Sequence, residues 1–174
     1  MLRAFLFTTL FFLTSLISAA DREWAVYQPG NGACYIKFPA NPEYQTQMAD
    51  AMATHIYVAK DSTRTPVFVY TLGFADYAKE KLADKDGAKK ILDTDRDNFV
   101  KAVVGKIVSE KPLKKEAFSG RMIVISREDG QARYLLCEFL VENRLFQLSV
   151  CVPAASVDDP DVAKFFDSFQ LPKK

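Results

Sequence analysis

The stretch that decides the fold runs from Ala132 to Val152: Ala-Arg-Tyr-Leu-Leu-Cys-Glu-Phe-Leu-Val at 132–141, Glu142-Asn143, then Arg-Leu-Phe-Gln-Leu-Ser-Val-Cys-Val at 144–152. Two runs rich in β-branched, aromatic and aliphatic residues are separated by two residues, a spacing that predicts a β-hairpin. Asn143 tolerates the positive φ that such a turn requires. We therefore expect two paired strands with Glu142 and Asn143 as the turn.

Pairing across this turn places apolar side chains on both faces of the hairpin. Because side chains alternate along a strand, one face carries Phe139 opposite Phe146 and the other carries Glu138 opposite Gln147. A sheet that is apolar on both sides needs cover on both sides. The other predicted partners are Val141 with Arg144, Cys137 with Leu148, Leu135 with Val150, Tyr134 with Cys151, Leu136 with Ser149 and Leu140 with Leu145.

A helix that can supply one cover follows the hairpin directly. Asp159 is a suitable N-cap, and Pro160 suits the first helical position. An apolar stripe at helical spacing follows, and Pro172 is expected to end the helix. The stripe consists of Val162, Phe165, Phe166 and Phe169.

The rest of the chain reads as short strands around a single long helix. Asp86 is the expected cap of that helix, and Gly105 its expected end. Its apolar face indicates a second cover, opposite the C-terminal helix. The order predicts one α+β domain with a mostly antiparallel central sheet flanked by helices on both faces, an α/β/α sandwich. The expected strands are 24–28, 34–38, 44–48, 52–60, 67–74, which should be central, 106–111 and 121–127, with turns at 29–32 and 128–130.

The N-terminus has the composition of a secretory signal peptide. Arg3 precedes an apolar stretch, and Ser18-Ala19-Ala20 supplies small residues before the charged Asp21. This pattern predicts a signal at residues 1–20, cleavage after Ala20 and an exported protein, periplasmic or secreted, whose single domain spans 21–174. No later segment is long and apolar enough to predict a membrane span.

Charge and cysteine content limit the classes of partner. Without Arg3 the chain has 22 basic and 22 acidic residues, whereas a nucleic-acid surface usually shows a basic balance or patch. No nucleic-acid partner is therefore expected. An oxidising compartment permits one disulfide among Cys34, Cys137 and Cys151. In the predicted register Cys137 and Cys151 point to opposite faces, so a disulfide would involve Cys34 with an undetermined partner; three buried thiols are the equal alternative.

No set of residues predicts a catalytic, cofactor-binding or metal site. The run 93–98, Asp-Thr-Asp-Arg-Asp-Asn, begins like a calcium loop but lacks its glycine and its final glutamate, so we interpret its acids as a solvated helix face. His55 is the only histidine, and the sequence offers no nucleophile-elbow pattern beside it. Three arginines at 121, 133 and 144 either gather as an anion fork or pair with Glu128, Glu138 and Glu142; pairing is the simpler interpretation.

Three segments of the C-terminal half form a recognisable pattern: Phe118-Ser119-Gly120-Arg121, Val141-Glu142-Asn143-Arg144-Leu145-Phe146-Gln147-Leu148 and Lys164-Phe165-Phe166-Asp167-Ser168-Phe169-Gln170-Leu171. They resemble exported bacterial proteins of unknown function with a PsbP-like fold, shared by the photosystem II extrinsic protein PsbP and a Ran-binding nuclear transport protein. The resemblance implies a sandwich of sheet and helices and a protein that binds other proteins. Its motif residues, of unknown role, are Gly120, Arg121, Asn143, Arg144, Phe165, Phe166, Ser168 and Phe169.

These observations favour an exported, non-enzymatic binding or accessory protein with an unknown protein partner and no cofactor. The partner surface is expected at an exposed sheet edge or at the loop 29–32. An alternative is a carrier that holds a small apolar ligand between sheet and helix. A third hypothesis is a hydrolase-like enzyme centred on His55. The partner's identity and the oligomeric state do not follow from the sequence.

Overall fold

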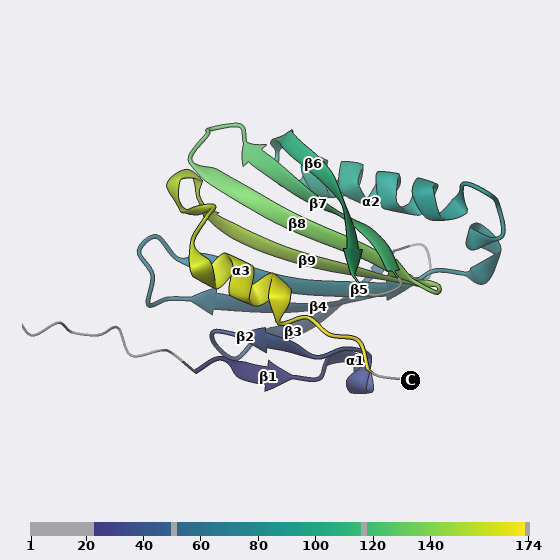
Figure 1. The fold of residues 1–174 in the computed structure, drawn as a ribbon, viewed down its shortest axis with the longest axis horizontal. Helices are drawn as coiled ribbons and strands as arrows, with labels where there is room; N and C mark the ends of the chain where they lie inside the picture. Colours follow the sequence, from purple (N-terminus) through teal and green to yellow (C-terminus); the bar gives the residue numbers. More distant parts are fainter. Residues whose placement is uncertain (1–22, 50–51, 116–117, 173–174) are drawn as a thin grey trace, which may run out of the picture.

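The computed structural model describes residues 23–49, 52–115 and 118–172 (Figure 1). Its fold is mostly antiparallel and rich in sheet, with three helices in the described ranges. The predicted signal peptide and its cleavage after Ala20 lie outside the described residues.

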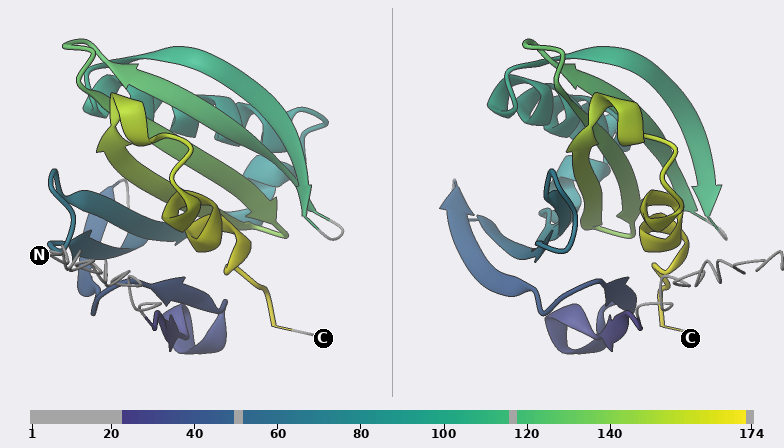
Figure 2. Two further views of the ribbon diagram at one scale, coloured as in Figure 1. Left: turned by 60° about the vertical axis from the view of Figure 1, so that its left-hand side comes forward. Right: turned by 90° about the vertical axis from the view of Figure 1, so that its left-hand side faces the viewer.

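A seven-stranded sheet dominates the molecule, in the order β3-β4-β5-β9-β8-β7-β6 with every neighbouring pair antiparallel. Figure 2 shows that the sheet curves strongly from β3 to β6. The strands are β3 (Glu43–Ala49), β4 (Met52–Asp61), β5 (Phe68–Asp76), β6 (Gly105–Lys115), β7 (Phe118–Arg127), β8 (Ala132–Val141) and β9 (Arg144–Pro153). The other elements are β1 (Ala25–Tyr27), α1 (Pro29–Gly32), β2 (Ile36–Phe38), the 3-10 turns η1 (Lys79–Leu82) and η2 (Ala154–Ser156), α2 (Gly87–Ala102) and α3 (Pro160–Asp167).

The predicted hairpin is confirmed as β8 and β9, residue for residue, from Val141 opposite Arg144 to Tyr134 opposite Cys151. The conformation of the turn differs from the prediction, because Glu142 takes the positive φ of 55° and Asn143 does not. Asn143 instead fixes the turn to the end of β5. Its amide donates to the Tyr77 carbonyl at 2.9 Å, and the Tyr77 N–H donates to the Asn143 carbonyl at 2.8 Å.

The larger core lies on the face of the sheet that carries Phe139 and Phe146. Phe169 stacks on Phe139 with ring centroids 5.9 Å apart and meets Phe146 edge-on at 5.3 Å. Phe165 contacts Tyr70 at 5.3 Å. These buried rings each remove a large apolar area from water, so they contribute roughly 1.5–3 kcal/mol apiece.

Helix α3 begins as predicted and ends earlier than predicted. The Asp159 side chain accepts from the Asp161 N–H at 3.0 Å, as an N-cap should. The helix ends at Asp167, because the Ser168 hydroxyl donates to the Phe165 carbonyl at 2.7 Å and Gln170 then pairs with Tyr35 through both backbone hydrogen bonds. Pro172 therefore does not end this helix.

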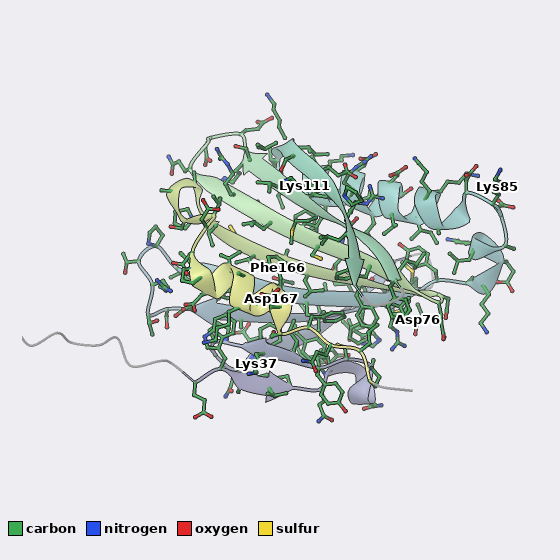
Figure 3. The ribbon with its side chains drawn as sticks, in the orientation of Figure 1. Lys37, Asp76, Lys85, Lys111, Phe166 and Asp167 are labelled. Carbon is green, nitrogen blue, oxygen red and sulfur yellow. The ribbon has the colours of Figure 1, made fainter. Side chains whose placement is uncertain are left out.

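The first two expected strands lie outside the seven-stranded sheet and form a separate two-stranded sheet, β1 with β2. The Lys37 N–H of β2 donates to the Ser168 hydroxyl at 3.0 Å, which joins this pair to the end of α3. Figure 3 shows Lys37 beside Phe166 and Asp167 of α3. Phe38 contacts Phe165 at 5.5 Å, so β1, β2 and α3 together enclose the larger core.

A smaller core lies against α2. Ile123, Ile125 and Leu136 are buried there beneath Phe99, whose ring meets Tyr134 edge-on at 6.0 Å. Leu136 and Tyr134 alternate along β8 with the residues of the larger core.

The end of α2 differs from the prediction as well. Val104 takes the positive φ of 50°, whereas Gly105 begins β6. A Cβ at Gly105 would lie 2.6 Å from Ile125 Cγ2, so this glycine is needed for close packing against β7.

Gly120 gives a test of the packing between β7 and β8. A Cβ there would lie 2.1 Å from the Glu138 carbonyl oxygen and 2.6 Å from Phe139 Cδ1, so Gly120→Ala should lower the free energy of unfolding by about 2–3 kcal/mol in urea titrations. Gly73→Ala in β5 is the matched control, since its Cβ would lie 3.7 Å from the nearest atom. The control should be neutral or slightly stabilising. Equal effects at the two positions would contradict this account of Gly120.

Candidate interaction surface

One edge of the sheet carries a row of aromatic side chains on a single face. Tyr44 is opposite Tyr57, and Thr46 is opposite His55, which is in turn opposite Phe74. Tyr44 is 54% exposed and Met48 is 68% exposed. We name this surface the aromatic edge; its residues are Tyr44, Thr46 and Met48 of β3, His55 and Tyr57 of β4, and Phe74 of β5.

Short contacts order the side chains of the aromatic edge. The Tyr44 hydroxyl lies 2.7 Å from His55 Nδ1 and accepts a hydrogen bond from the Thr46 hydroxyl at 2.7 Å. The His55 ring stacks on Phe74, with centroids 4.8 Å apart and planes 23° apart. The ring centroids of Tyr44 and Tyr57 lie 4.9 Å apart. Exposed rings held in one arrangement lose little conformational entropy when a partner covers them.

The buried Phe74 anchors the aromatic edge to the sheet. The guanidinium of Arg144 lies over its ring at 5.2 Å and is held by two hydrogen bonds of 2.6 Å to the Asp76 carboxylate. These bonds hold the pKa of Asp76 below its ordinary value. Figure 3 shows Asp76 at the end of β5.

The turn α1 lies against the same ring. Gly30 has φ 60°, and a Cβ on it would lie 2.7 Å from Phe74 Cζ. Only glycine allows this close approach. The sheet edge and the loop 29–32, which the sequence suggested as two separate partner sites, therefore adjoin at Phe74.

The two edges of the sheet differ in composition. Strand β6 exposes Lys106, Lys111 and Pro112, the kinds of residue that discourage pairing with another strand. Strand β3 is exposed along residues 43–48 and has no lysine or proline; its one charged residue is Glu43. Of the two edges, β3 is the one open to an additional strand.

Among the residues that the structure describes, His55 contacts aromatic side chains. Its imidazole contacts the Tyr44 hydroxyl and stacks on Phe74, and the Thr46 hydroxyl donates to Tyr44 instead of to the imidazole. A triad needs a nucleophile in hydrogen-bond contact with the histidine and a carboxylate behind it. The geometry is that of a stacked aromatic surface.

The three arginines that could have formed an anion fork do not lie together. Arg121 shares the face of β7 that lies under α2, with the Glu138 ion pair at 3.3 Å, whereas Arg144 lies on the other face with Asp76. Arg133 lies at the opposite end of the hairpin from Arg144 and donates to the Ser126 hydroxyl at 2.7 Å. The pairing interpretation holds for Arg121 with Glu138, and Arg144 uses Asp76 in place of a glutamate.

The remaining motif residues have structural positions. Gly120 allows β7 to approach β8, and Asn143 fixes the hairpin turn. Ser168 caps α3, while Phe165 and Phe169 are buried in the larger core and Phe166 packs at its border. Within the described residues these side chains form no common site.

A polar cluster beneath α2 was missed by the sequence analysis. The run 93–98 is helical, as interpreted, but Asp95 faces the sheet instead of solvent. The Gln147 amide donates to Asp95, and the Asp95 and Glu138 carboxyls are hydrogen-bonded to each other. We name Asp95 and Glu138 the acid pair. Burial is the main cause that raises the pKa of Asp95 to about 6 and that of Glu138 to about 8.

The alternation of Glu138 with apolar neighbours in β8 was the one sequence signal for this cluster. A charged residue in the middle of a strand that is buried on both faces needs a partner. The partner came from a helix that is distant in sequence, so no local spacing could identify it.

Two kinds of feature are absent from the described ranges. No group of three or more His, Cys, Asp or Glu side chains is placed to hold a metal ion. None of the helices there combines the length and the apolar character that crossing a membrane requires.

All three cysteines are reduced thiols in the structure. Cys34 and Cys137 are buried, and Cys151 is half-buried. Burial raises the pKa of Cys34 to about 12, and burial raises the pKa of Cys151 as well. The predicted disulfide involving Cys34 therefore stays a prediction, which the alkylation experiment below tests.

No protein-family model matches the sequence, and no curated protein matches it either. Solved structures do match the fold. The solution structure of cyanobacterial PsbP (CyanoP) from Synechocystis sp. PCC 6803 aligns with a TM-score of 0.62 at 8% identity, over 92% of this chain and 99% of that one. The Saccharomyces cerevisiae Ran-binding protein Mog1p aligns with a TM-score of 0.51 at 9% identity, over 86% and 96%.

The chain has a PsbP-like fold. At such low identity the likeness extends to the fold alone, and no functional residue transfers from either neighbour. The resemblance read from the C-terminal motifs is thereby confirmed at the level of the fold. In this chain the motif residues lie at the hairpin turn, at the close approach of β7 and β8, and at the end of α3.

Alkylation tests the state of the cysteines. Because the thiolate is the reactive form, the native protein should react slowly with iodoacetamide at Cys34 and Cys137. After unfolding without reductant, mass spectrometry should find three adducts per chain. A single adduct per chain would mean that two of the cysteines form a disulfide, contrary to the structure.

Proposed function

We propose that this protein is a non-enzymatic binding module that pairs β3 with an extended segment of another protein chain. One observation carries the proposal: the exposed edge strand lacks the lysines and prolines found at the opposite edge and presents ordered aromatic side chains. An added strand would gain backbone hydrogen bonds from β3 and side-chain contacts from Tyr44 and Met48.

The composition of the aromatic edge supports a protein partner. Tyrosine, methionine and arginine are enriched where protein chains meet, and a few buried aromatic residues carry most of the binding energy. Tyr44 can supply apolar area while its hydroxyl stays bonded to His55 and Thr46. One structural neighbour, Mog1p, is described as a Ran-binding protein, which supports protein binding for the fold in general.

The proposal includes an α/β/α arrangement in which α2 and α3 cover the two faces of the sheet. It is supported by Phe99 of α2 against Tyr134 and by Phe169 after α3 against Phe139, on alternate sides of β8. With its faces covered, the sheet offers a partner mainly its edges. A ligand carrier has less support, because aromatic rings in mutual contact fill the space between sheet and α3.

Site-specific photo-crosslinking tests the binding edge. A photoreactive amino acid at Met48 should give one dominant adduct with another protein in cells that express the chain natively. Tyr44→Ala should reduce that adduct by tenfold or more, since an aromatic hot spot is worth at least about 2 kcal/mol. Both side chains are largely exposed, so the variants should keep the native fold.

The matched control carries the same probe at Val108, which is exposed on β6 at the other edge. It should give no adduct with that partner. Equal labelling from both edges, or no effect of Tyr44→Ala, would refute the proposed use of β3.

We further propose that the protein is exported with cleavage after Ala20, on the strength of its signal-like N-terminal composition. N-terminal sequencing of the native protein should begin at Asp21, and the protein should fractionate with the periplasm or the medium. Retention of Met1, or recovery from the cytoplasmic fraction, would count against export.

A further inference from the structure

The acid pair includes a fully buried carboxyl group, and an ionised group in such a place loses its hydration. Glu138 is in the middle of β8 and is 0% exposed. Its carboxyl is hydrogen-bonded to that of Asp95, which reaches down from α2. The Gln147 amide donates to Asp95 and faces Glu138 Oε1 at 3.5 Å. Helix and sheet therefore meet at two carboxyl groups.

This contact has a chemical requirement. An ionised carboxylate only accepts hydrogen bonds, so two carboxylates cannot bond to each other. One of the two must carry a proton that it donates to the other. Glu138 Oε2 agrees with this requirement, because it is buried and receives no hydrogen bond from a described donor.

The nearby arginine does not remove the need for a proton. Arg121 has its Nε 3.3 Å from Glu138 Oε2, but its terminal nitrogen is bonded to Glu110 at 2.7 Å and to Asp93 at 3.0 Å. Arg96 also pairs with Glu110, at 3.2 Å. With Lys89 on Asp93 and Asp97 on Arg96, three cationic groups face five carboxyl groups, those of Asp93, Asp95, Asp97, Glu110 and Glu138. Full ionisation would therefore leave excess negative charge around buried Glu138.

We propose that the acid pair is a proton-binding site, in which Asp95 and Glu138 hold one proton between them at neutral pH and thereby fix α2 to the sheet. The occupant is a single proton. The site is distinct from the aromatic edge, which lies on the other face of the sheet, and it does not depend on the proposed function.

Other groups around the pair do not titrate in its place. Burial and the neighbouring Asp95 and Glu138 raise the pKa of Tyr77 to about 12, so its hydroxyl stays neutral. Gln147 is an amide and carries no charge. Asp93 has a lowered pKa, because it is hydrogen-bonded to Lys89 and Arg121, and stays ionised. Asp95 and Glu138 are thus the groups that can exchange a proton near neutral pH.

The direction of the pH effect follows from the raised pKa values. Once α2 has left the sheet, the pKa values of both carboxyls should return toward their ordinary values of about 4. Between pH 6 and 8 the closed state keeps the proton of Glu138, and the open state has released it. Raising the pH therefore favours the open state: the equilibrium constant for opening should rise about tenfold per pH unit, because one proton is released.

The loss of structure at alkaline pH should at first be confined to α2. The C-terminal half of α2 is held by apolar contacts of Phe99 and Val103 with the smaller core, which do not depend on pH. The acid pair holds the middle of the helix through Asp95. At alkaline pH we expect α2 to detach while the larger core under α3 remains intact.

Hydrogen exchange and carboxyl NMR on the full-length protein test the proposal. Amides of α2 should lose protection by about tenfold per pH unit from pH 6 to 8, beyond the intrinsic rate, while amides of β9 keep theirs. The Glu138 side-chain carboxyl carbon should titrate near pH 8 in the native protein. This second measurement uses the unmodified chain and does not depend on any variant's folding.

Glu138→Gln provides the discriminating variant. Its amide can donate to Asp95 at every pH, so protection of α2 should lose the pH dependence between 6 and 8. Asp97→Asn is the matched control, an acid-to-amide change on the same helix at an exposed residue that pairs with Arg96. It should retain the wild-type slope.

Two results would overturn the proton site. One is a Glu138 carboxyl that titrates below about pH 5 in the native protein. The other is a pH slope of α2 protection that is the same in Glu138→Gln as in the wild type. Both results are expected if Asp95 and Glu138 form a contact in which no proton titrates near neutral pH.

Discussion

The register between β8 and β9 is the constraint on which the rest of the structure depends. Because the side-chain period of a strand is two, this register assigns each residue to one of two faces at once. Phe139 and Phe146 lie on the side of the larger core, and Glu138 and Gln147 lie under α2. A shift by one residue would move Glu138 to the face of the larger core and Phe139 to the face under α2.

Both faces of this hairpin are used, but in different ways. One face is apolar, and buried rings of the larger core fill it. The other face combines a small apolar core with a charged cluster. Burial of apolar area stabilises the first contact at any pH, whereas the second also depends on the protonation of Asp95 and Glu138.

Apart from the acid pair under α2, the polar and aromatic groups open to a partner lie along an edge of the sheet. Among the described residues, the motif positions fix turns and close approaches, and they do not assemble reactive groups. The aromatic edge is the surface on which ordered, exposed side chains coincide with unprotected backbone, next to the turn at Gly30. This coincidence is the basis on which we propose that the edge binds another protein chain.

The sequence by itself determined the hairpin pairs, the N-cap of α3, the positions of most strands and the likeness in fold. These features follow from local periodicity and from turn and cap residues that act within a few positions. Tertiary structure decided where β1 and β2 lie, that Val104 and Glu142 take the positive φ, and that α3 ends at Asp167. It also brought Asp95 to Glu138 and Gly30 to Phe74. Those contacts join residues more than 40 positions apart, and whether a carboxyl group is solvated or buried depends on which surface its helix packs against, which no local pattern records.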